Sequence, residues 1–379
     1  MFQVGSWTQI EDVWSFFQQV LTRCSIGTLF GTQIFKKYPR LTKDLWEFED
    51  AIQGVLPALS WFTMSLPGIP NPGPYKEPMT RLGQGINKWL RASHSGTEFA
   101  KTGSDDADWD EHRGSKFIQE RDDLFAKAPF SIENRTAEML DVMHCSNVEL
   151  IPSAIWAMIE ILRKPYLADK ITAFVSEPQA TKAAAPDEDG MLARPLFQSL
   201  QAEVSRLRFA KYTICTNPTA EVAVDSAWTL RKGCNAVSFS QDLALNTKAW
   251  ANARPRTVEK PLEEFWAERF LVADKDTPHI QGQRKSRGSM NAARFDAQDL
   301  ELLVPALGDK QAFGLASDYI KAMQAATMAV LLREFEIQLC DPDLIDAAMP
   351  ELRESAFGQV RPKEKIAVRI RKRRAGKEQ

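Results

Sequence analysis

A long helical segment between Ser131 and Lys164 constrains the fold more than any other part of the sequence. Ser131 is a favourable N-cap, apolar residues then recur at helical spacing, and Pro165 ends the segment. A helix that is so rich in apolar residues has to be mostly buried against other elements. Pro152 removes one backbone donor, so we expect a bend or local break there. The segment predicts a large, mainly helical core.

The same spacing rules predict several further elements along the chain. Helices are expected over residues 6–38 (capped by Ser6 or Thr8, with a second helix from Gly27), 41–55, 81–92 and 318–335. Short strands are expected over residues 221–237, with a turn at Arg231–Gly233, and an edge strand over residues 366–370. Residues 246–261 are expected to form a loop. The predicted fold class is therefore mainly α with small β-sheets.

Two segments have compositions typical of loops and solvated ends. Residues 178–194 are rich in alanine, proline, aspartate and glycine, which predicts a mobile surface loop. Residues 372–379 form a basic tail. The run Arg369–Arg374 could bind nucleic acid, but a strand followed by a solvated terminus is the simpler interpretation.

Composition excludes several classes of function. A net charge of −2 and a pI near 6.2 give no reason to expect a nucleic-acid partner. Only four histidines are present, so a histidine-based metal site is not expected. The five cysteines are dispersed and odd in number, which is typical of reduced thiols inside a cell. No continuous apolar run reaches membrane-spanning length and no signal peptide is recognisable, so we expect a cytoplasmic protein.

Three charged residues form a predicted cluster in apolar surroundings. Glu203 and Arg206 are three residues apart, which places them on one face of a helix within bonding reach. A buried pair of this kind needs further hydrogen bonds to offset its desolvation. The segment Trp266–Phe270 supplies Arg269, whose planar guanidinium suits a carboxylate.

This Glu-x-x-Arg helix, followed by a Glu-Arg-Phe segment with a supporting arginine, resembles the cytochrome P-450 family of haem-thiolate monooxygenases. Residues 356–371 resemble the closing hairpin of the family, especially in its fungal secondary-metabolism branch. The resemblance implies a single partial domain over residues 1–379, N-terminally truncated and without the membrane anchor and first strands. Full-length relatives are anchored in the endoplasmic reticulum membrane. Glu203, Arg206 and Arg269 would then form a structural brace beside the haem.

The resemblance fails at the iron ligand. The family holds its iron through a cysteine thiolate in a Gly-rich loop before a helix. The corresponding loop here, Val304–Ala316, contains no cysteine. Counting forward from Pro305 places Phe313 at the ligand position, and counting back from Phe335 places Gly314 there. The resemblance therefore implies haem as cofactor, with weak or absent binding in this chain.

Other positions of the family pattern also differ. Ser146–Trp156 is similar to the helix that crosses the distal face of the haem, where many members carry an acid and an alcohol. This chain has Glu149 followed by leucine, so the proton relay lacks its hydroxyl. In the family, an arginine after the Glu-x-x-Arg helix pairs with a haem propionate, and the corresponding position here is Cys215. A histidine that most members carry before a conserved tryptophan corresponds to a position near Leu245. Trp109 and Arg113 match a propionate-binding spacing, but their acidic surroundings indicate a coincidence.

Three functions are compatible with these observations. The first is an inactive cytochrome P-450-like protein, or pseudoenzyme, with the fold retained and the haem chemistry lost. The second is an active haem-dependent monooxygenase of terpenoid, polyketide or alkaloid biosynthesis, with an unusual ligand and a reductase as partner. The third is a haem-free binding protein or cyclase for a hydrophobic small molecule. Glu149 is its candidate acid because burial raises a carboxyl pKa, and the simpler alternative is that Glu149 faces solvent.

Overall fold

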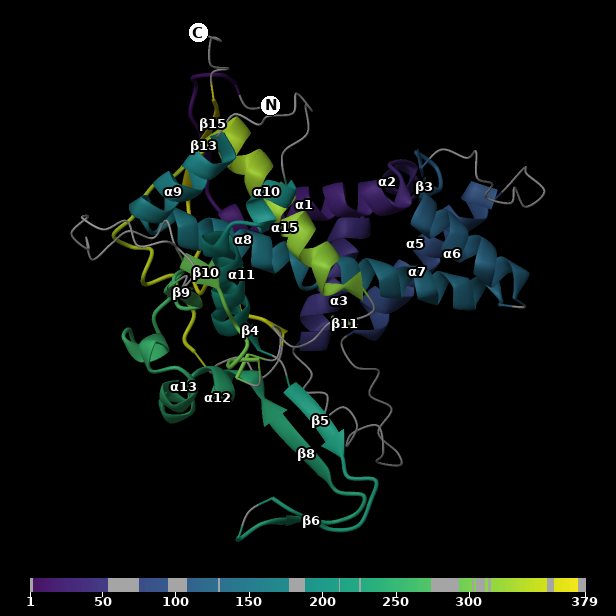
Figure 1. The fold of residues 1–379 in the computed structure, drawn as a ribbon. Helices are drawn as coiled ribbons and strands as arrows, with labels where there is room; N and C mark the ends of the chain where they lie inside the picture. Colours follow the sequence, from purple (N-terminus) through teal and green to yellow (C-terminus); the bar gives the residue numbers. More distant parts are fainter. Residues whose placement is uncertain are drawn as a thin grey trace. The chain divides into compact units, whose positions relative to one another are not determined.

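A computed structural model describes most of the chain. The described residues are 3–53, 75–94, 108–128, 130–176, 188–210, 212–224, 226–273, 293–301, 303–304, 311–312, 315–352 and 358–373. In this part the protein is mainly helical with short antiparallel sheets, as the sequence predicted (Figure 1). Residues 66–74, which are rich in proline, and residues 274–292, which are polar, are expected from their composition to be irregular and lie outside the described residues.

The chain forms two compact units. Unit 1 comprises Met1–Val13, Ser153–Ala312 and Ser317–Gln379. Unit 2 comprises Trp14–Pro152 and Phe313–Ala316. Each unit has its own buried apolar residues, which is the usual property of a compact folding unit. The prediction that residues 1–379 form one domain stays a prediction.

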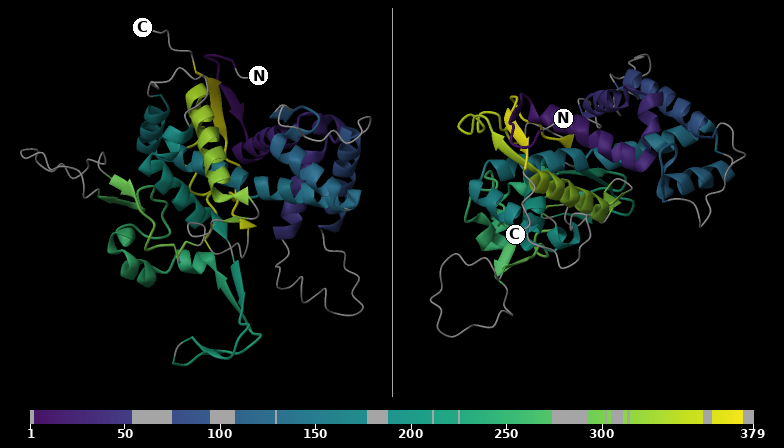
Figure 2. Two further views of the ribbon diagram at one scale, coloured as in Figure 1. Left: turned by 45° about the vertical axis from the view of Figure 1, so that its right-hand side comes forward. Right: turned by 90° about the horizontal axis from the view of Figure 1, so that it is seen from above.

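Unit 2 is a helical bundle with one short hairpin. Its elements are α1 (Val13–Phe30, continuous with unit 1 at Val13), α2 (Gln33–Lys37), α3 (Leu41–Gln53), α5 (Lys76–His94), β2 (Trp109–Asp110), β3 (Gly114–Ser115), α6 (Lys116–Lys127) and α7 (Ile132–Asn147). Helix α5 packs against both α3 and α7. Their shared core includes Phe30, Leu45, Ile86, Trp89 and Met139. The helices of this core can be followed in Figure 2.

Two glycines let the end of α1 approach the β2–β3 hairpin closely. Gly31 has φ +79° and ends α1, and Gly114 has φ +84° in the hairpin. A Cβ on Gly114 would lie 2.1 Å from the Leu29 carbonyl oxygen. Trp109 Nε1 donates to the Thr28 carbonyl at 2.9 Å in the same contact. The second helix predicted within residues 6–38 therefore begins at Gln33 rather than at Gly27, because the chain turns at Gly31.

Replacing Gly114 by alanine is therefore expected to destabilise unit 2 by at least about 3 kcal/mol. A left-handed backbone costs an L-residue about 1–2 kcal/mol, and the steric clash with Leu29 adds to that. Urea denaturation followed by circular dichroism measures the loss. Gly233→Ala is the matched control, because Gly233 has φ +78° but nothing within 4 Å of the added Cβ. Equal losses in both variants would contradict a role for the close approach.

The predicted long helix is divided into two. Ser131 caps α7 as expected, with its side chain accepting from the Asn134 amide. The helix ends at Asn147, and α8 then runs over Leu150–Leu162. Pro152 lies in the first turn of α8, where its missing N–H has no intrahelical partner to lose. The predicted local break of the helix is confirmed, and it lies at Val148–Glu149 because Pro152 has no N–H to bond the Val148 carbonyl four residues earlier.

The segment Ile132–Leu162 is long and apolar enough to cross a membrane, and 83% of its most apolar window is buried inside the protein. Ile155, Trp156 and Ile159 of α8 are all at most 1% exposed. Burial on every face explains the apolar content of α8, since a helix in a core needs no polar side.

Unit 1 contains most of the remaining elements. Its helices are α8, α9 (Pro165–Ser176), α10 (Glu188–Leu192), α11 (Pro195–Arg208), α12 (Ser240–Ala244), α13 (Thr247–Ala253), the 3₁₀ helix η1 (Pro255–Val258) and α15 (Ser317–Glu334). Its shorter strands are β4 (Phe209–Ala210), β9 (Leu271–Ala273), β10 (Ala293–Phe295), β11 (Gln311–Ala312) and β14 (Gly358–Gln359). One further strand, β12 (Leu315–Ala316), belongs to unit 2.

A three-stranded antiparallel sheet joins the two ends of the chain. Its order is β1 (Thr8–Ile10), β15 (Val368–Lys372) and β13 (Phe335–Leu339). The predicted edge strand is therefore central, because β1 adds to its outer side with Gln9 opposite Arg369. For the same reason the predicted N-cap at Ser6 or Thr8 was wrong, and α1 begins at Val13. Lys372 also belongs to β15 rather than to a solvated tail.

A two-stranded ribbon extends away from α11 (Figures 1 and 2). It pairs β5 (Tyr212–Thr216) with β8 (Asn235–Phe239), and β6 (Val222–Ala223) pairs with β7 (Thr229–Leu230) nearer its tip. The predicted strands over 221–237 and the turn at Gly233 are confirmed.

Two predicted loops contain short helices. Residues 246–261 include α13 and η1, and the Asn246 side chain caps α13 by accepting from the Ala249 amide at 3.0 Å. Sequence spacing missed α13 because a seven-residue helix is too short to show a periodic pattern. Residues 178–194 include α10 at Glu188–Leu192, while the rest of that predicted loop, up to residue 187, lies outside the described residues.

Candidate functional site

Helix α11 carries Glu203 and Arg206 on its buried face. Pro195 occupies its first turn, where proline is favourable, and Leu200, Val204 and Leu207 anchor the helix in the core of unit 1. The Glu203 and Arg206 side chains are fully buried. A buried ion pair is stable only where hydrogen bonds replace the lost water, so the polar contacts of these two residues decide what the site can do.

The Glu203 carboxylate accepts four hydrogen bonds. Arg206 donates from Nε to Oε2 at 2.7 Å and from Nη2 to Oε1 at 2.8 Å, in a bidentate pair. Oε1 also accepts from Arg269 Nε at 2.9 Å and from the Trp266 amide at 3.0 Å. The structure therefore brings together the three residues that the sequence singled out. Glu203, Arg206 and Arg269 are referred to below as the Glu203 cluster.

Arg269 clamps the segment between η1 and β9. Its Nη2 donates to the Pro261 and Glu264 carbonyls at 2.9 and 2.8 Å. Its Nη1 donates to the Lys260 carbonyl at 3.1 Å and to the Thr257 carbonyl. With the bond from Nε to Glu203, all five N–H donors of Arg269 are used. This segment has few regular backbone–backbone hydrogen bonds. The Arg269 guanidinium satisfies several of its backbone carbonyls instead.

The charges of the cluster favour the ionised carboxylate. Burial by itself would raise the pKa of Glu203, but the charge and hydrogen bonds of Arg206 and the charge of Arg269 outweigh it and lower that pKa. Arg206 lies 5.4 Å from the Trp250 ring centroid, and Arg269 lies 5.4 Å from that of Trp266. Two cations around one carboxylate are thus stabilised by aromatic faces as well.

This arrangement leaves little free for chemistry. The remaining terminal nitrogen of Arg206, Nη1, donates to the Ala244 carbonyl at 3.0 Å, and Arg269 has no N–H to offer. A carboxylate with four donors and two arginine partners is a poor general base, because taking up a proton would disrupt the pair. The Glu203 cluster therefore joins α11, α12 and the 257–269 segment and has a structural role.

A second buried cluster was missed by the sequence analysis. Glu160 of α8 is 0% exposed and accepts from Arg208 Nε at 3.1 Å and from Arg163 Nη1 at 2.8 Å. Arg163 also donates to Asp346 at 2.5 Å, and Arg208 lies 4.5 Å from the Trp156 ring centroid. Glu160, Arg163 and Arg208 are referred to below as the Glu160 cluster.

The signal for this cluster was present in the sequence. Glu160 and Arg163 have the same Glu-x-x-Arg spacing as Glu203 and Arg206, and Glu160 follows an apolar run. Arg208 is the last residue of α11, two residues after Arg206. Helix α11 therefore supplies Arg206 to the Glu203 cluster and Arg208 to the Glu160 cluster. A search for every Glu-x-x-Arg pair in apolar surroundings would have found both clusters.

Glu149, the candidate acid of a haem-free enzyme, does not lie inside a helix. It lies in the two-residue turn between α7 and α8 and is partly exposed. Sequence reasoning placed it inside the apolar helical segment, and the local break that accompanies Pro152 falls at Glu149 itself. Its role as an acid stays a prediction, and Glu160 is the fully buried carboxylate of α8.

Trp109 and Arg113, the pair with a propionate-binding spacing, both have hydrogen-bond partners within the protein. Trp109 contacts the end of α1, as described above, and Arg113 Nη2 donates to Asp123 at 2.9 Å. Cys215, at the expected propionate-binding position, is in β5 opposite Ala236, and Leu245 is buried after α12. Phe313 and Gly314, the two candidate ligand positions, lie outside the described residues.

The cysteines whose side chains are described lie outside the loop before α15. Burial and the nearby Asp141 carboxylate raise the pKa of Cys145 to about 12, and burial raises the pKa of Cys24. Cys24, Cys234 and Cys340 are exposed, and Cys145 is buried. Within the described residues, no group of three or more potential metal ligands is found.

In unit 2, His144 and Glu49 form a largely buried pair that should make stability depend on pH. His144 Nδ1 lies 2.5 Å from Glu49 Oε1. Burial by itself would lower the pKa of His144, but the hydrogen bond and charge of Glu49, with the charge of Asp141, raise it. The contribution is full below the unfolded-state pKa of about 6.5 and is lost as pH rises through the raised folded-state value. Urea midpoints should therefore decrease across this window, and His144→Gln should remove that decrease.

Comparison with known proteins identifies similar sequences but no matching family model. The chain is 26% identical over 384 aligned positions to the cytochrome P-450 monooxygenase fsoE of Humicola fuscoatra, covering 97% of this chain and 63% of that protein. It is 25% identical to the cytochrome P-450 monooxygenase efuG of Hormonema carpetanum, covering 97% and 65%. A third relative, calL of Penicillium decumbens, is 25% identical over 73% of this chain.

The chain thus spans slightly less than two thirds of the length of the first two relatives. Its mainly helical fold with small antiparallel sheets agrees with this similarity. Fold and sequence together support a relationship of this chain to the fungal cytochrome P-450 monooxygenases.

Proposed function

We propose that this chain is a cytochrome P-450-like protein, related to monooxygenases of secondary metabolism, that lacks haem-thiolate monooxygenase activity. One observation carries the proposal. The loop Val304–Ala316, which precedes α15, contains no cysteine, and Phe313 or Gly314 stands at the ligand position. Neither residue offers a side-chain lone pair to iron, so the electron donation that favours O–O cleavage has no source in this loop.

The positions of the described cysteines support the same proposal. Cys24 and Cys145 belong to helices α1 and α7. Cys340 follows β13, so α15 and β13 separate it from the loop along the chain. None of these cysteines stands at the position that the family uses for its ligand.

The buried clusters support retention of the fold. A cluster such as Glu203, Arg206 and Arg269 contributes to stability only if all its partners are present, because one missing partner leaves a buried charge. Its complete hydrogen bonding is compatible with a chain that keeps its scaffold after losing its chemistry. The partner that we propose for such a scaffold is a hydrophobic small molecule.

Haem content tests the proposal. Purified protein, produced with excess haem precursor, is expected to contain far less than one haem per chain and to show no stoichiometric Soret band. Titration with hemin should give weak binding or none. Stoichiometric haem with turnover of a hydrophobic substrate by a supplied reductase would overturn the proposal. If the protein converts such a substrate without haem, the proposed loss of monooxygenase activity stands and the chain has a haem-free activity.

A further inference from the structure

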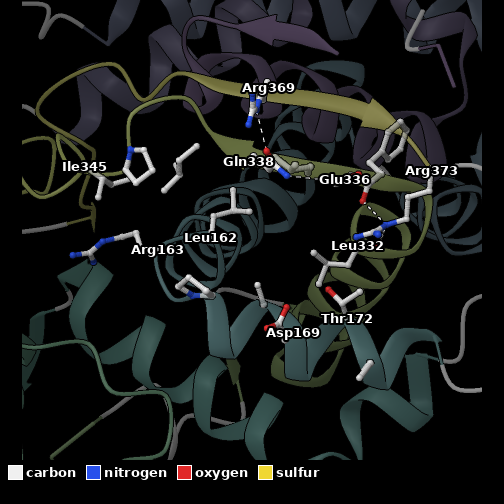
Figure 3. Close-up of a pocket in the computed structure, with 17 residues that line it drawn as sticks. Leu162, Arg163, Asp169, Thr172, Leu332, Glu336, Gln338, Ile345, Arg369 and Arg373 are labelled. Carbon is white, nitrogen blue, oxygen red and sulfur yellow. Dashed lines mark hydrogen bonds between the residues drawn. The ribbon is translucent and has the colours of Figure 1, made fainter. Parts of the chain in front are cut away.

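A pocket of about 770 Å³ lies in unit 1 between helix α9 and the strands β13 and β15, and Arg163 of the Glu160 cluster is part of its lining (Figure 3). Its volume is within the range of small-molecule sites. Among the described residues, no member of the Glu203 cluster lines it. A ligand site in this pocket would go beyond the proposed function.

Helix α9 leaves room for the pocket because it presents short side chains. The residues that line this wall recur at helical spacing on one face, at Pro165, Ala168, Asp169, Thr172 and Ala173. Opposite them lie the end of α15 and strand β13. The apolar part of the lining is formed by Leu162, Leu332, Ile337, Leu339 and Ile345. An aliphatic body would therefore find apolar surface between the two walls.

Two arginines bound the strand side of the pocket. Arg369 Nε donates to Gln338 at 3.0 Å, and its guanidinium lies 5.0 Å from the Trp7 ring centroid. Arg373 Nε donates to the Leu332 and Phe335 carbonyls at 3.0 and 2.9 Å. Among the described residues, the terminal nitrogens of neither arginine have a hydrogen-bond or ion-pair partner. Both side chains are thus held at Nε and keep donors for a ligand.

The other charges of the strand side are already paired. Glu336 accepts from Arg371 Nε at 2.8 Å and from Gln338 at 2.9 Å. Arg163 is engaged by Glu160 and Asp346. This side therefore presents the two guanidinium groups of Arg369 and Arg373 as its available charge, which suits a carboxylate because guanidinium binds it bidentately.

The α9 side presents the opposite charge. Asp169 is exposed and has no hydrogen-bond or ion-pair partner within the described part of the chain. Figure 3 shows Asp169 on the α9 wall, with Arg369 and Arg373 across the pocket. An anion at this wall would be repelled, whereas a hydroxyl could donate to the carboxylate. The pocket therefore distinguishes the two ends of a ligand.

We propose that this pocket binds an aliphatic carboxylic acid that carries a hydroxyl group at its far end. The carboxylate lies against Arg369 and Arg373, the aliphatic chain covers the apolar lining, and the hydroxyl donates to Asp169. Charge complementarity at both walls fixes the orientation, and burial of the chain supplies most of the affinity.

Isothermal titration calorimetry with ω-hydroxydodecanoate, below its aggregation concentration, tests the proposal. The 379-residue chain should bind one molecule, and the methyl ester, which lacks the negative charge, should bind at least about tenfold more weakly. Dodecanoate, which lacks the hydroxyl, should bind about threefold to tenfold more weakly. Equal binding of the three compounds would overturn the proposal, because hydrophobic adsorption alone predicts that result.

Variants locate the binding to this pocket. Arg369→Gln should weaken binding of ω-hydroxydodecanoate about tenfold, and Asp169→Asn should reduce its preference over dodecanoate. Thr172→Trp should fill the pocket and abolish binding. Arg231→Gln, an exposed arginine on the β5–β8 ribbon, is the matched control and should change nothing. Because Asp169 is exposed and without a described partner, Asp169→Asn should fold normally. Binding that survives Thr172→Trp in a folded protein would contradict the assignment.

Discussion

Replacing Glu203 by glutamine is expected to destabilise the protein by about 3–5 kcal/mol, the typical cost of removing one partner from a buried ion pair. The substitution keeps the shape of the side chain but leaves Arg206 and Arg269 buried as two cations without their counter-charge. Glutamine keeps one acceptor oxygen, but its NH2 group replaces the other, so one of the two Arg206 donors faces a donor instead of an acceptor. Urea denaturation of the purified variant measures the loss directly.

Repeating the urea denaturation at decreasing pH gives a second test of the Glu203→Gln variant. Because the pKa of Glu203 is lowered in the folded protein, its stabilising contribution is present above the unfolded-state pKa of about 4.3 and is lost as pH falls through the folded-state value. The variant should therefore show less acid destabilisation than the wild-type protein.

The matched control is Glu221→Gln. Glu221 pairs with Arg231 at 3.8 Å, but the two side chains are 66% and 81% exposed. Such a surface pair is worth about 0–1 kcal/mol, so the control should hardly change the urea midpoint. A similar small loss for Glu203→Gln would show that the Glu203 cluster does not organise the fold.

Replacing Glu160 by glutamine is expected to cost about 3 kcal/mol, the lower end of the range for a buried pair. Arg208 is almost fully buried and loses its carboxylate partner. Arg163 keeps Asp346, which limits the loss. The measurement is again the free energy of unfolding in urea.

Asp346→Asn is the control for the Glu160 cluster. The Asp346 side chain is 81% exposed and shares Arg163 with Glu160, so its removal should cost at most about 1 kcal/mol. If Asp346→Asn destabilises the protein as much as Glu160→Gln, burial does not control the strength of this cluster.

The helical class of the fold could be predicted because apolar spacing is a local property. Helices α3 and α15 follow such spacing closely, and Ser131 marks the start of α7 through its own side chain. Strand β1 could not be predicted in the same way, because it exists only by pairing with β15 more than 350 residues later. Local sequence cannot specify a partner at that distance.

The Glu203 cluster could be anticipated because two of its members lie on one helical turn and the third follows an unusual aromatic segment. The Glu160 cluster depends on Arg208, which reaches α8 only after α11 has folded beside it. The pocket beside α9 has no sequence signature, since its charges come from separate elements. Sequence therefore predicts pairs within an element better than sites that are assembled from several elements.

We expect that no cysteine of this chain supplies a thiolate ligand to haem iron, because the loop before α15 contains none. The most direct measurement is the difference spectrum of the reduced, carbon monoxide-treated protein after loading with hemin. Phe313→Cys and Gly314→Cys serve as positive controls, and at least one should gain the band of thiolate-ligated haem. The account predicts no such band for the wild-type chain. A wild-type band of stoichiometric intensity would contradict it.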